Sequence, residues 1–420
     1  MSDTITLTLT GMAHGGAALG REMGGQSRGS RVIFVPYALP GEEVEVELVM
    51  VKERYAQARL QKVLRPSADR VSPPCPYFGV CSGCHFQHIA YPRQLALKEE
   101  VVRDQLGRIA GITSLPLLPI IPNPEPYGYA SDLTLSPTTT GGMGLWAASE
   151  RHVIPVDDCL LPRPPLRQLL QDVDMALPDL RRVTLRMGDD GALLAALEVE
   201  DVEPPEIGVD FPVSVALVLP DGTAANLIGD NYVVQAVGGR DFRVSAGAFF
   251  YSSPPMTEKL VQTVLAFADL RGGEQVLELY SGVGTLTAFL AAAADEVTAI
   301  EANVDAVADM AVNLEDVDNV SVYEGAAEAV LPLLTVRPDV VVVDPGGGGM
   351  PASVLQPLIQ LNPNRLIYVS DDVATLARDA RHLTRGGYRL AQIQPLDMEP
   401  QTFHILTVSL WQPHEGFARN

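Results

Sequence analysis

The chain has 420 residues, of which 47% are hydrophobic and 20% charged, so it is too long for one compact core and two or three domains are expected. It contains no run of about twenty uncharged apolar residues, and its first residues lack the basic-then-apolar order of a signal peptide. We therefore expect a cytoplasmic protein that neither spans a membrane nor is secreted.

The formal net charge of −22 is unevenly distributed. Residues 1–128 hold 13 Lys and Arg against 12 Asp and Glu, which gives +1, and the remainder holds 17 against 40, which gives −23. Bulk electrostatic binding of nucleic acid needs basic contacts to phosphate, so this balance argues against it, and no DNA partner is expected. A polyanion should meet the N-terminal part first. A simpler explanation of the excess of acidic residues is that it keeps the protein soluble.

The N-terminal residues 4–63 alternate short apolar strands with Gly- and Pro-rich turns such as AHGGAALG, which is typical of a small β-barrel. Barrels of this type often bind oligonucleotides, although a purely structural module fits equally well. A cysteine-containing segment leads into an expected helix at about 92–109, followed by a β-rich middle region at about 128–250. The predicted domains are 1–64, 65–250 and 251–420.

After residue 255, apolar strands alternate with helical stretches. Strands are predicted at 275–280, 296–302, 320–325, 339–345, 365–371, 388–394 and 404–410. This order predicts an α/β fold with a doubly wound sheet, in which a ligand binds beyond the carboxyl ends of the strands.

A glycine-rich turn, LELYSGVGTLT, follows the first of these strands. Gly282 and Gly284 permit a tight turn, and Glu301 at the end of the next strand can accept hydrogen bonds from two ribose hydroxyls. The turn lacks the third glycine of a dinucleotide site and the Lys of a P-loop, so S-adenosylmethionine is the leading ligand. A merely structural turn is the alternative. Asp344 ends the strand DVVVVDP, where such sheets place reactive groups, or else it caps the next helix.

Three of the four cysteines lie within ten residues of one another. Cys75, Cys81 and Cys84, with Cys159 downstream, are the soft ligands that hold zinc or a [4Fe–4S] cluster, and spacing alone does not separate the two. Because all four are candidate ligands, no thiol is left for catalysis.

Several segments in chain order carry a family resemblance: FVPYALPGEEVEVEL, RVSPPCPYFGVCSGCHFQHIAYPRQLALK, GAFFYSSPPMTEKLV, VLELYSGVGTLT, AIEANVDAV and VVVVDPGG. Together they resemble the bacterial S-adenosylmethionine-dependent uridine-5-methyltransferases of 23S rRNA or tRNA. The resemblance implies an N-terminal TRAM barrel, RNA as partner, and a class I methyltransferase domain. It also implies a [4Fe–4S] cluster on the four cysteines. The residues expected to bind the cofactor are Tyr251, Tyr280, Gly282, Gly284, Glu301 and Asp344.

The catalytic positions of that family are occupied differently here. Its enzymes add a cysteine thiolate to uridine C6 and later remove the C5 proton with a carboxylate base. Asp371 stands at the cysteine position and Leu406 at the base position. His404 is retained and could take a proton, although a packed structural histidine is favoured. An arginine and a cofactor-contacting glutamine of the family are replaced by Gly347 and Tyr251.

Two functions are compatible with these changes. The first is an RNA methyltransferase that has lost the covalent uridine mechanism, with Asp344, Asp371 and Asp372 as candidate bases. The second is a catalytically silent homologue that binds RNA or a protein partner while keeping the cluster and the cofactor fold.

Overall fold

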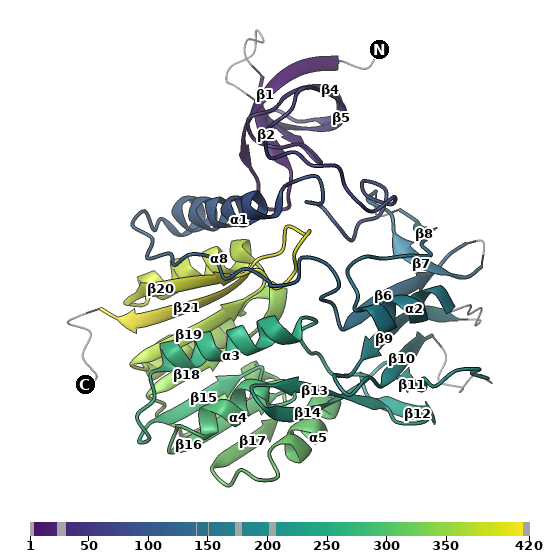
Figure 1. The fold of residues 1–420 in the computed structure, drawn as a ribbon. Coiled ribbons are helices and arrows are strands. Elements are labelled where there is room, and N and C mark those ends of the chain that lie inside the picture. The colour runs from purple at the N-terminus through teal and green to yellow at the C-terminus, as the bar shows by residue number, and fades with distance from the viewer. Residues whose placement is uncertain are drawn as a thin grey trace.

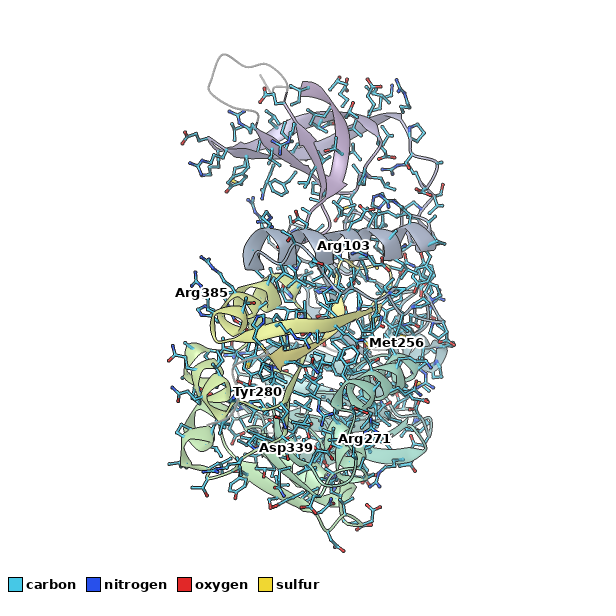
Figure 2. The ribbon with its side chains drawn as sticks, turned by 90° about the vertical axis from the view of Figure 1, so that its left-hand side faces the viewer. Arg103, Met256, Arg271, Tyr280, Asp339 and Arg385 are labelled. Carbon is cyan, nitrogen blue, oxygen red and sulfur yellow. The ribbon has the colours of Figure 1, made fainter. Side chains whose placement is uncertain are left out.

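The computed structural model describes residues 4–22, 31–139, 141–149, 151–172, 179–200 and 207–414. A small barrel stands above helix α1, the C-terminal sheet lies below that helix, and a second large sheet lies to one side (Figure 1). The view turned by 90° shows the same stacking, with Arg103 of α1 directly beneath the barrel (Figure 2). Within the described residues, no helix is long and apolar enough to cross a membrane.

The N-terminal barrel closes in the order β1-β2-β3-β5-β4, from strands β1 (Thr4–Met12), β2 (Ala18–Arg21), β3 (Val32–Val35), β4 (Glu43–Val51) and β5 (Tyr55–Arg65). Period-2 alternation buries Leu7 and Leu9 inside it. The sequence indicated a turn where β2 lies. The AHGGAALG segment pairs with β1 and β3 because closing the barrel requires a strand between them.

The linker after the barrel is anchored by a buried ion pair. Glu42 is fully buried and accepts hydrogen bonds from Arg70 (Nε–Oε1 2.6 Å) and from the backbone N–H groups of Leu39 and Ser67. The expected helix follows as α1 (Tyr91–Gln105), which continues as a π-helical turn over Leu106–Ala110.

Helix α1 is joined to the end of the chain by a polar contact in the interior. Lys98 is 1% exposed and donates to Asp397 Oδ1 (2.5 Å) and to the Glu399 carbonyl oxygen (3.1 Å). Tyr91 also donates to Asp397 (2.8 Å). An isolated charge at this depth would be costly, so this pairing fixes the segment 397–404 against α1.

The middle region forms a seven-stranded sheet in the order β12-β11-β10-β9-β6-β7-β8. Its elements are β6 (Asp132–Pro137), β7 (Met143–Trp146), β8 (Val153–Pro155), α2 (Pro164–Asp172), β9 (Leu180–Met187), β10 (Leu193–Val199), β11 (Ser214–Val218) and β12 (Ala224–Ile228). The hairpin of β13 (Tyr232–Val237) and β14 (Arg240–Ser245) forms a separate two-stranded sheet. Its buried residues Val233 and Phe242 belong to the hydrophobic core of the C-terminal part.

The C-terminal sheet has the order β17-β16-β15-β18-β19-β21-β20, in which β21 alone runs antiparallel to the other strands. The strands are β15 (Gln275–Leu279), β16 (Glu296–Glu301), β17 (Val320–Glu324), β18 (Val340–Val343), β19 (Arg365–Ser370), β20 (Tyr388–Leu396) and β21 (Leu406–Pro413). The chain reverses its winding between β15 and β18, which confirms the doubly wound α/β fold.

Helices cover both faces of this sheet. Alternate residues of the buried strands face opposite sides, so Val276 and Val342 pack on one side while Leu277 and Val343 pack on the other. The first side carries α3 (Pro254–Ala268), α4 (Thr285–Ala291) and α5 (Val304–Asn313), and the second carries α6 (Ala327–Val330), α7 (Ala352–Leu361) and α8 (Val373–Arg385). Short 3₁₀ turns lie at Leu331–Leu333 and Gly346–Gly348.

Candidate functional site

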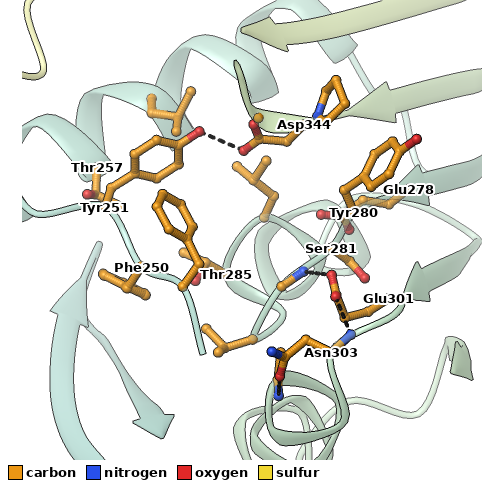
Figure 3. A pocket seen from close by; sticks show the side chains of 18 of the residues that line it. Phe250, Tyr251, Thr257, Glu278, Tyr280, Ser281, Thr285, Glu301, Asn303 and Asp344 are labelled. Carbon is orange, nitrogen blue, oxygen red and sulfur yellow. Dashed lines mark hydrogen bonds between the residues drawn. The ribbon is translucent and has the colours of Figure 1, made fainter. Parts of the chain in front are cut away.

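A cavity of about 360 Å³ opens beyond the carboxyl ends of β15, β16, β18 and β19; we call it the first cavity. This is the position at which a doubly wound sheet is expected to bind a ligand. Five of the six predicted cofactor residues line it: Tyr251, Tyr280, Gly282, Glu301 and Asp344. Figure 3 shows Tyr251 and Asp344 on one side of this cavity and Ser281, Glu301 and Asn303 on another.

Glu301 is held by backbone donors at the end of β16. Its carboxylate accepts hydrogen bonds from the N–H groups of Gly282 (2.8 Å), Ala302 (2.8 Å) and Asn303 (2.7 Å), and Figure 3 marks those of the turn and of Asn303. Oε1 already accepts two of these hydrogen bonds and Oε2 only one, so Oε2 keeps a lone pair that can accept from a hydroxyl of a ligand. The glycine turn and the acid are therefore one preorganised unit.

Gly284, the sixth predicted residue, does not line the cavity. It has a φ of +85° and precedes α4, and a Cβ atom at this position would lie 2.7 Å from Met310 Cγ on α5. Its glycine is required by the backbone conformation and by the close packing of α5.

Asp344 accepts a hydrogen bond from the Tyr251 hydroxyl (Oη–Oδ2 2.7 Å), which crosses the cavity from the segment before α3 (Figure 3). Burial raises the pKa of Asp344 to about 7, the Tyr251 hydrogen bond acts in the opposite direction, and the charge of Asp371 adds to the increase. The carboxyl therefore changes its charge near neutral pH, with Tyr251 positioned to stabilise the ionised form.

Glu278 on β15 also lines the first cavity, and the sequence analysis gave it no role. Its side chain is 2% exposed, and burial raises its pKa to about 8. Its Oε2 atom has no hydrogen-bond partner among the described residues. The acid lies within the glycine-turn motif itself, so its position before the turn was a usable signal.

A second cavity of about 420 Å³ adjoins the first, and the two share Phe249, Phe250, Tyr251 and Asp371. His404 and Leu406 line this second cavity as well. The structure thus brings Asp371, His404 and Leu406 into one cavity, although they come from segments more than thirty residues apart. Asp132 and Glu399 add two carboxylates, of which Glu399 carried no signal in the sequence.

Asp371 and His404 are both exposed at this cavity. Partial desolvation of its carboxyl raises the pKa of Asp371, and the charge of Asp372 acts in the same direction. The histidine was expected to pack on an apolar strand, and that prediction is wrong. β21 begins only at Leu406, and the imidazole of His404 lies outside it, stacked on Phe403 with ring centroids 4.4 Å apart.

The barrel reaches this region through its β1–β2 turn. His14 Nε2 lies 3.3 Å from Asp372 Oδ2, and Gly16 packs so closely that a Cβ atom there would lie 3.1 Å from Phe403 Cβ. Asp372 also caps α8 by accepting from the Thr375 N–H (2.7 Å). Burial tends to raise the pKa of Asp372, but the hydrogen bonds from His14 and Thr375 outweigh it and lower that pKa to about 2.

The four cysteines are free thiols at the edge of the middle sheet. Backbone hydrogen bonds from Ser82 to Trp146 (2.9 Å) and from Ala148 to Val80 (2.7 Å) hold their loop against that sheet. Burial raises the pKa of Cys84 to about 12 and that of Cys159 to about 11, and in both cases the charges of other cysteines contribute. Among the described residues, no group of three or more His, Cys, Asp or Glu side chains is arranged to hold a metal ion.

Sequence comparison decides the family. A model described as ribosomal RNA adenine dimethylase matches residues 249–327, and a TRAM domain model matches residues 3–60. An uncharacterized RNA methyltransferase of Halalkalibacterium halodurans is 32% identical to this chain, over 97% of both chains. The chain belongs to the RNA methyltransferase family. Another RNA methyltransferase, from Thermosynechococcus vestitus, is 31% identical over 97% of both chains.

A solved structure shares the architecture of this RNA methyltransferase family member. The Pyrococcus abyssi tRNA (uracil-54, C5)-methyltransferase, in complex with S-adenosyl-L-homocysteine, is 24% identical, with a TM-score of 0.72. The match covers 97% of the present chain and 100% of that chain. The expected TRAM barrel and α/β methyltransferase sheet are therefore confirmed as the fold.

Proposed function

We propose that this protein transfers a methyl group from S-adenosylmethionine to RNA without a covalent thiol step. The observation that carries this proposal is the pair of adjoining cavities that share Tyr251 and Asp371. The first would hold the cofactor, with Glu301 Oε2 accepting from a ribose hydroxyl and Asp344 near the positively charged end. The second would hold the methyl acceptor. The S-adenosyl-L-homocysteine bound to the Pyrococcus relative supports the cofactor assignment.

The residues around the second cavity support the loss of the uridine C5 mechanism. Asp371 can accept a proton or a hydrogen bond, but a carboxylate is a poor nucleophile toward the C6 atom of uracil. Leu406 is 3% exposed and offers no base. Methyl transfer to a nitrogen or an oxygen needs mainly alignment and a proton acceptor, so Asp371, Asp344 and His404 are the proposed catalytic residues.

The test is incubation of purified protein with radiolabelled S-adenosylmethionine and total RNA. We expect label in RNA and no 5-methyluridine by mass spectrometry of the digested product. Absence of transfer, together with cofactor binding by calorimetry, would refute the enzyme and favour the catalytically silent homologue. Formation of 5-methyluridine would refute the loss of the covalent mechanism.

We further propose that Cys75, Cys81, Cys84 and Cys159 hold a [4Fe–4S] cluster, which would join the loop 75–84 to the middle region. Four thiols whose charges influence one another form a suitable soft donor set, although their arrangement among the described residues is not that of a metal site. Zinc is the alternative. Anaerobically purified protein should be brown and bleach on reduction, and Cys84→Ser should lower its iron content. A colourless preparation with stoichiometric zinc would contradict the cluster.

The barrel is the proposed first contact for RNA in a cytoplasmic setting. The β4–β5 turn exposes Lys52, Arg54 and Tyr55, which offer phosphate contacts and an aromatic ring for stacking. Reversing both charges, Lys52→Glu with Arg54→Glu, should weaken RNA binding and flatten its salt dependence. Arg337→Glu, at an exposed site before β18, is the control. Equal effects of the two changes would contradict the assignment.

We also propose three structural units, 1–64, 65–250 and 251–420, with one adjustment. The β13–β14 hairpin shares its core with the C-terminal sheet, so the second boundary is better placed near residue 231. Limited proteolysis should leave the hairpin attached to the C-terminal fragment. Its recovery with the middle fragment would restore the boundary at 250.

A further inference from the structure

The second cavity is lined by acids. Asp132, Asp371 and Glu399 face it together with His404, and the described residues that line it include neither Lys nor Arg. Two buried cations lie behind this lining: Arg186 donates to the carbonyl oxygens of Ser245 (2.8 Å) and Ala248 (3.0 Å), and Lys98 donates to that of Glu399 (3.1 Å). Burial raises the pKa of Asp132, and the charge of Arg186 offsets only part of that increase. Asp371 and Glu399 form no ion pair within the described part of the chain, so the cavity keeps an excess of negative charge.

Two sequence changes that seemed independent meet at Asp371, which lines this cavity. A Cβ atom on Gly347 would lie 3.3 Å from Asp371 Oδ1, so the glycine at the expected arginine position faces the aspartate at the expected cysteine position. Together they remove a hydrogen-bond donor and add an acceptor. A ligand group that fits here must therefore donate hydrogen bonds.

An exposed aromatic ring lies at the boundary of the two cavities. Phe249 is 69% exposed and packs edge-on against Tyr251, with ring centroids 5.2 Å apart, and both residues line both cavities. Exposed rings of this kind stack unpaired bases in proteins that bind single-stranded RNA. The ring and the acids thus point to a flat ligand whose edge carries hydrogen-bond donors.

We propose that the second cavity receives an unpaired nucleobase that carries an exocyclic amino group, and that Asp371 accepts a hydrogen bond from this group. Adenine, cytosine and guanine present such a group. Uracil presents carbonyl oxygens on both sides of its single ring N–H, and these would face the carboxylates unfavourably. The inference rests on the proposed methyl transfer and specifies its acceptor as a nitrogen.

The reaction balances with these residues. The amino nitrogen attacks the methyl carbon of S-adenosylmethionine, and the carbon–sulfur bond breaks with its electron pair left on sulfur, which yields S-adenosylhomocysteine. The nitrogen, now positively charged, releases a proton to the Asp371 carboxylate. Because Asp371 is exposed, it passes this proton to water.

Base preference in binding tests this inference without any methyl transfer. The probes are four fluorescent oligouridylates that differ only in one central base, A, C, G or U, measured by anisotropy with saturating S-adenosylhomocysteine. At least one amino-bearing base should bind about tenfold more tightly than U, the size expected for a hydrogen bond to a charged group. Asp371→Ala should remove this preference, and Asp318→Ala, exposed at the opposite end of the strands, should keep it.

The outcomes separate this inference from the proposed function. Equal affinity for the four RNAs, including no measurable binding of any, would overturn it, as would a preference that survives in Asp371→Ala. Retained S-adenosylhomocysteine binding shows that this variant is folded. In the transfer assay, label on uridine C5 would overturn the inference while supporting methyl transfer. Absence of label would refute the proposed function and leave the binding preference as an independent result.

Discussion

Asp344 is expected to make binding of a positively charged methyl donor depend on pH. Its pKa of about 7 leaves about 9% of the carboxyl ionised at pH 6 and about 91% at pH 8. If the sulfonium group of S-adenosylmethionine is bound by the ionised form, its affinity should rise about tenfold between these pH values. S-adenosylhomocysteine lacks that charge and otherwise has the same ionisable groups, so its affinity serves as the internal reference.

The assay is isothermal titration calorimetry with both compounds at pH 6, 7 and 8. The ratio of the two affinities should rise with pH in the native protein. In Asp344→Asn the ratio should be flat, because the amide keeps the shape of the side chain and cannot ionise. Glu278 faces the same cavity with a pKa of about 8 and is about half ionised at pH 8, so the comparison that isolates Asp344 is between pH 6 and pH 7, where Glu278 stays at least about 91% protonated. A flat ratio in the native protein, or a rising ratio in Asp344→Asn, would refute the reasoning.

Without ligand, the free energy of unfolding should fall as the pH rises, which is opposite to the rise in affinity for the methyl donor. The folded protein holds the Asp344 proton up to a pKa of about 7, whereas the pKa of a free aspartate is 3.8. Between these values the folded state binds more protons than the unfolded state. The contribution of Asp344 to the free energy of unfolding is therefore lost as the pH rises through this window, and a saturating methyl donor should offset that loss.

Three further predictions concern stability. Lys98→Met leaves the buried Asp397 without its cation and should lower the free energy of unfolding by about 3–5 kcal/mol in urea titrations. Adding Asp397→Leu should recover most of this loss, and no recovery would contradict the pairing. Asp372→Ala removes the cap of α8 and should cost about 1 kcal/mol in the same measurement, whereas Asp372→Asn keeps the accepting oxygen and should cost less; equal losses would argue against capping. Gly284→Ala should lower the melting temperature because φ is +85°, with about 1–2 kcal/mol from the backbone alone, and Gly273→Ala, where a Cβ meets nothing within 4 Å, should not.

The local fold was predictable for strands that are buried on both faces of the sheet, because such strands consist of consecutive apolar residues. The strands at 275–279, 296–301 and 340–343 begin and end within two residues of the predicted ranges. β2 was missed because it is only four residues long, contains a glycine and directly follows the Gly-rich turn, so its strand conformation comes from barrel closure. His404 was wrongly assigned to a strand because it precedes an apolar run, whereas the strand itself begins two residues later, at Leu406.

The site was predictable in part, because its motifs follow the strands in order. The glycine turn and Glu301 could be placed from spacing, and the resemblance added Tyr251, which lies 93 residues before its hydrogen-bond partner. The contact of His14 with Asp372 and the position of Glu399 in the second cavity depend on the packing of distant segments. No local pattern in the sequence contains that information.

The β1–β2 turn of the barrel has a consequence for any attempt to exchange domains within this family. His14 contacts Asp372, the residue next to Asp371, and Gly16 fits against Phe403, the residue next to His404. A barrel grafted from a relative would therefore bring a foreign turn against the neighbours of Asp371 and His404, two of the side chains that face the second cavity. Chimeras should therefore retain residues 13–16 of the recipient. These residues belong to the N-terminal barrel in sequence, but His14 and Gly16 contact the C-terminal domain.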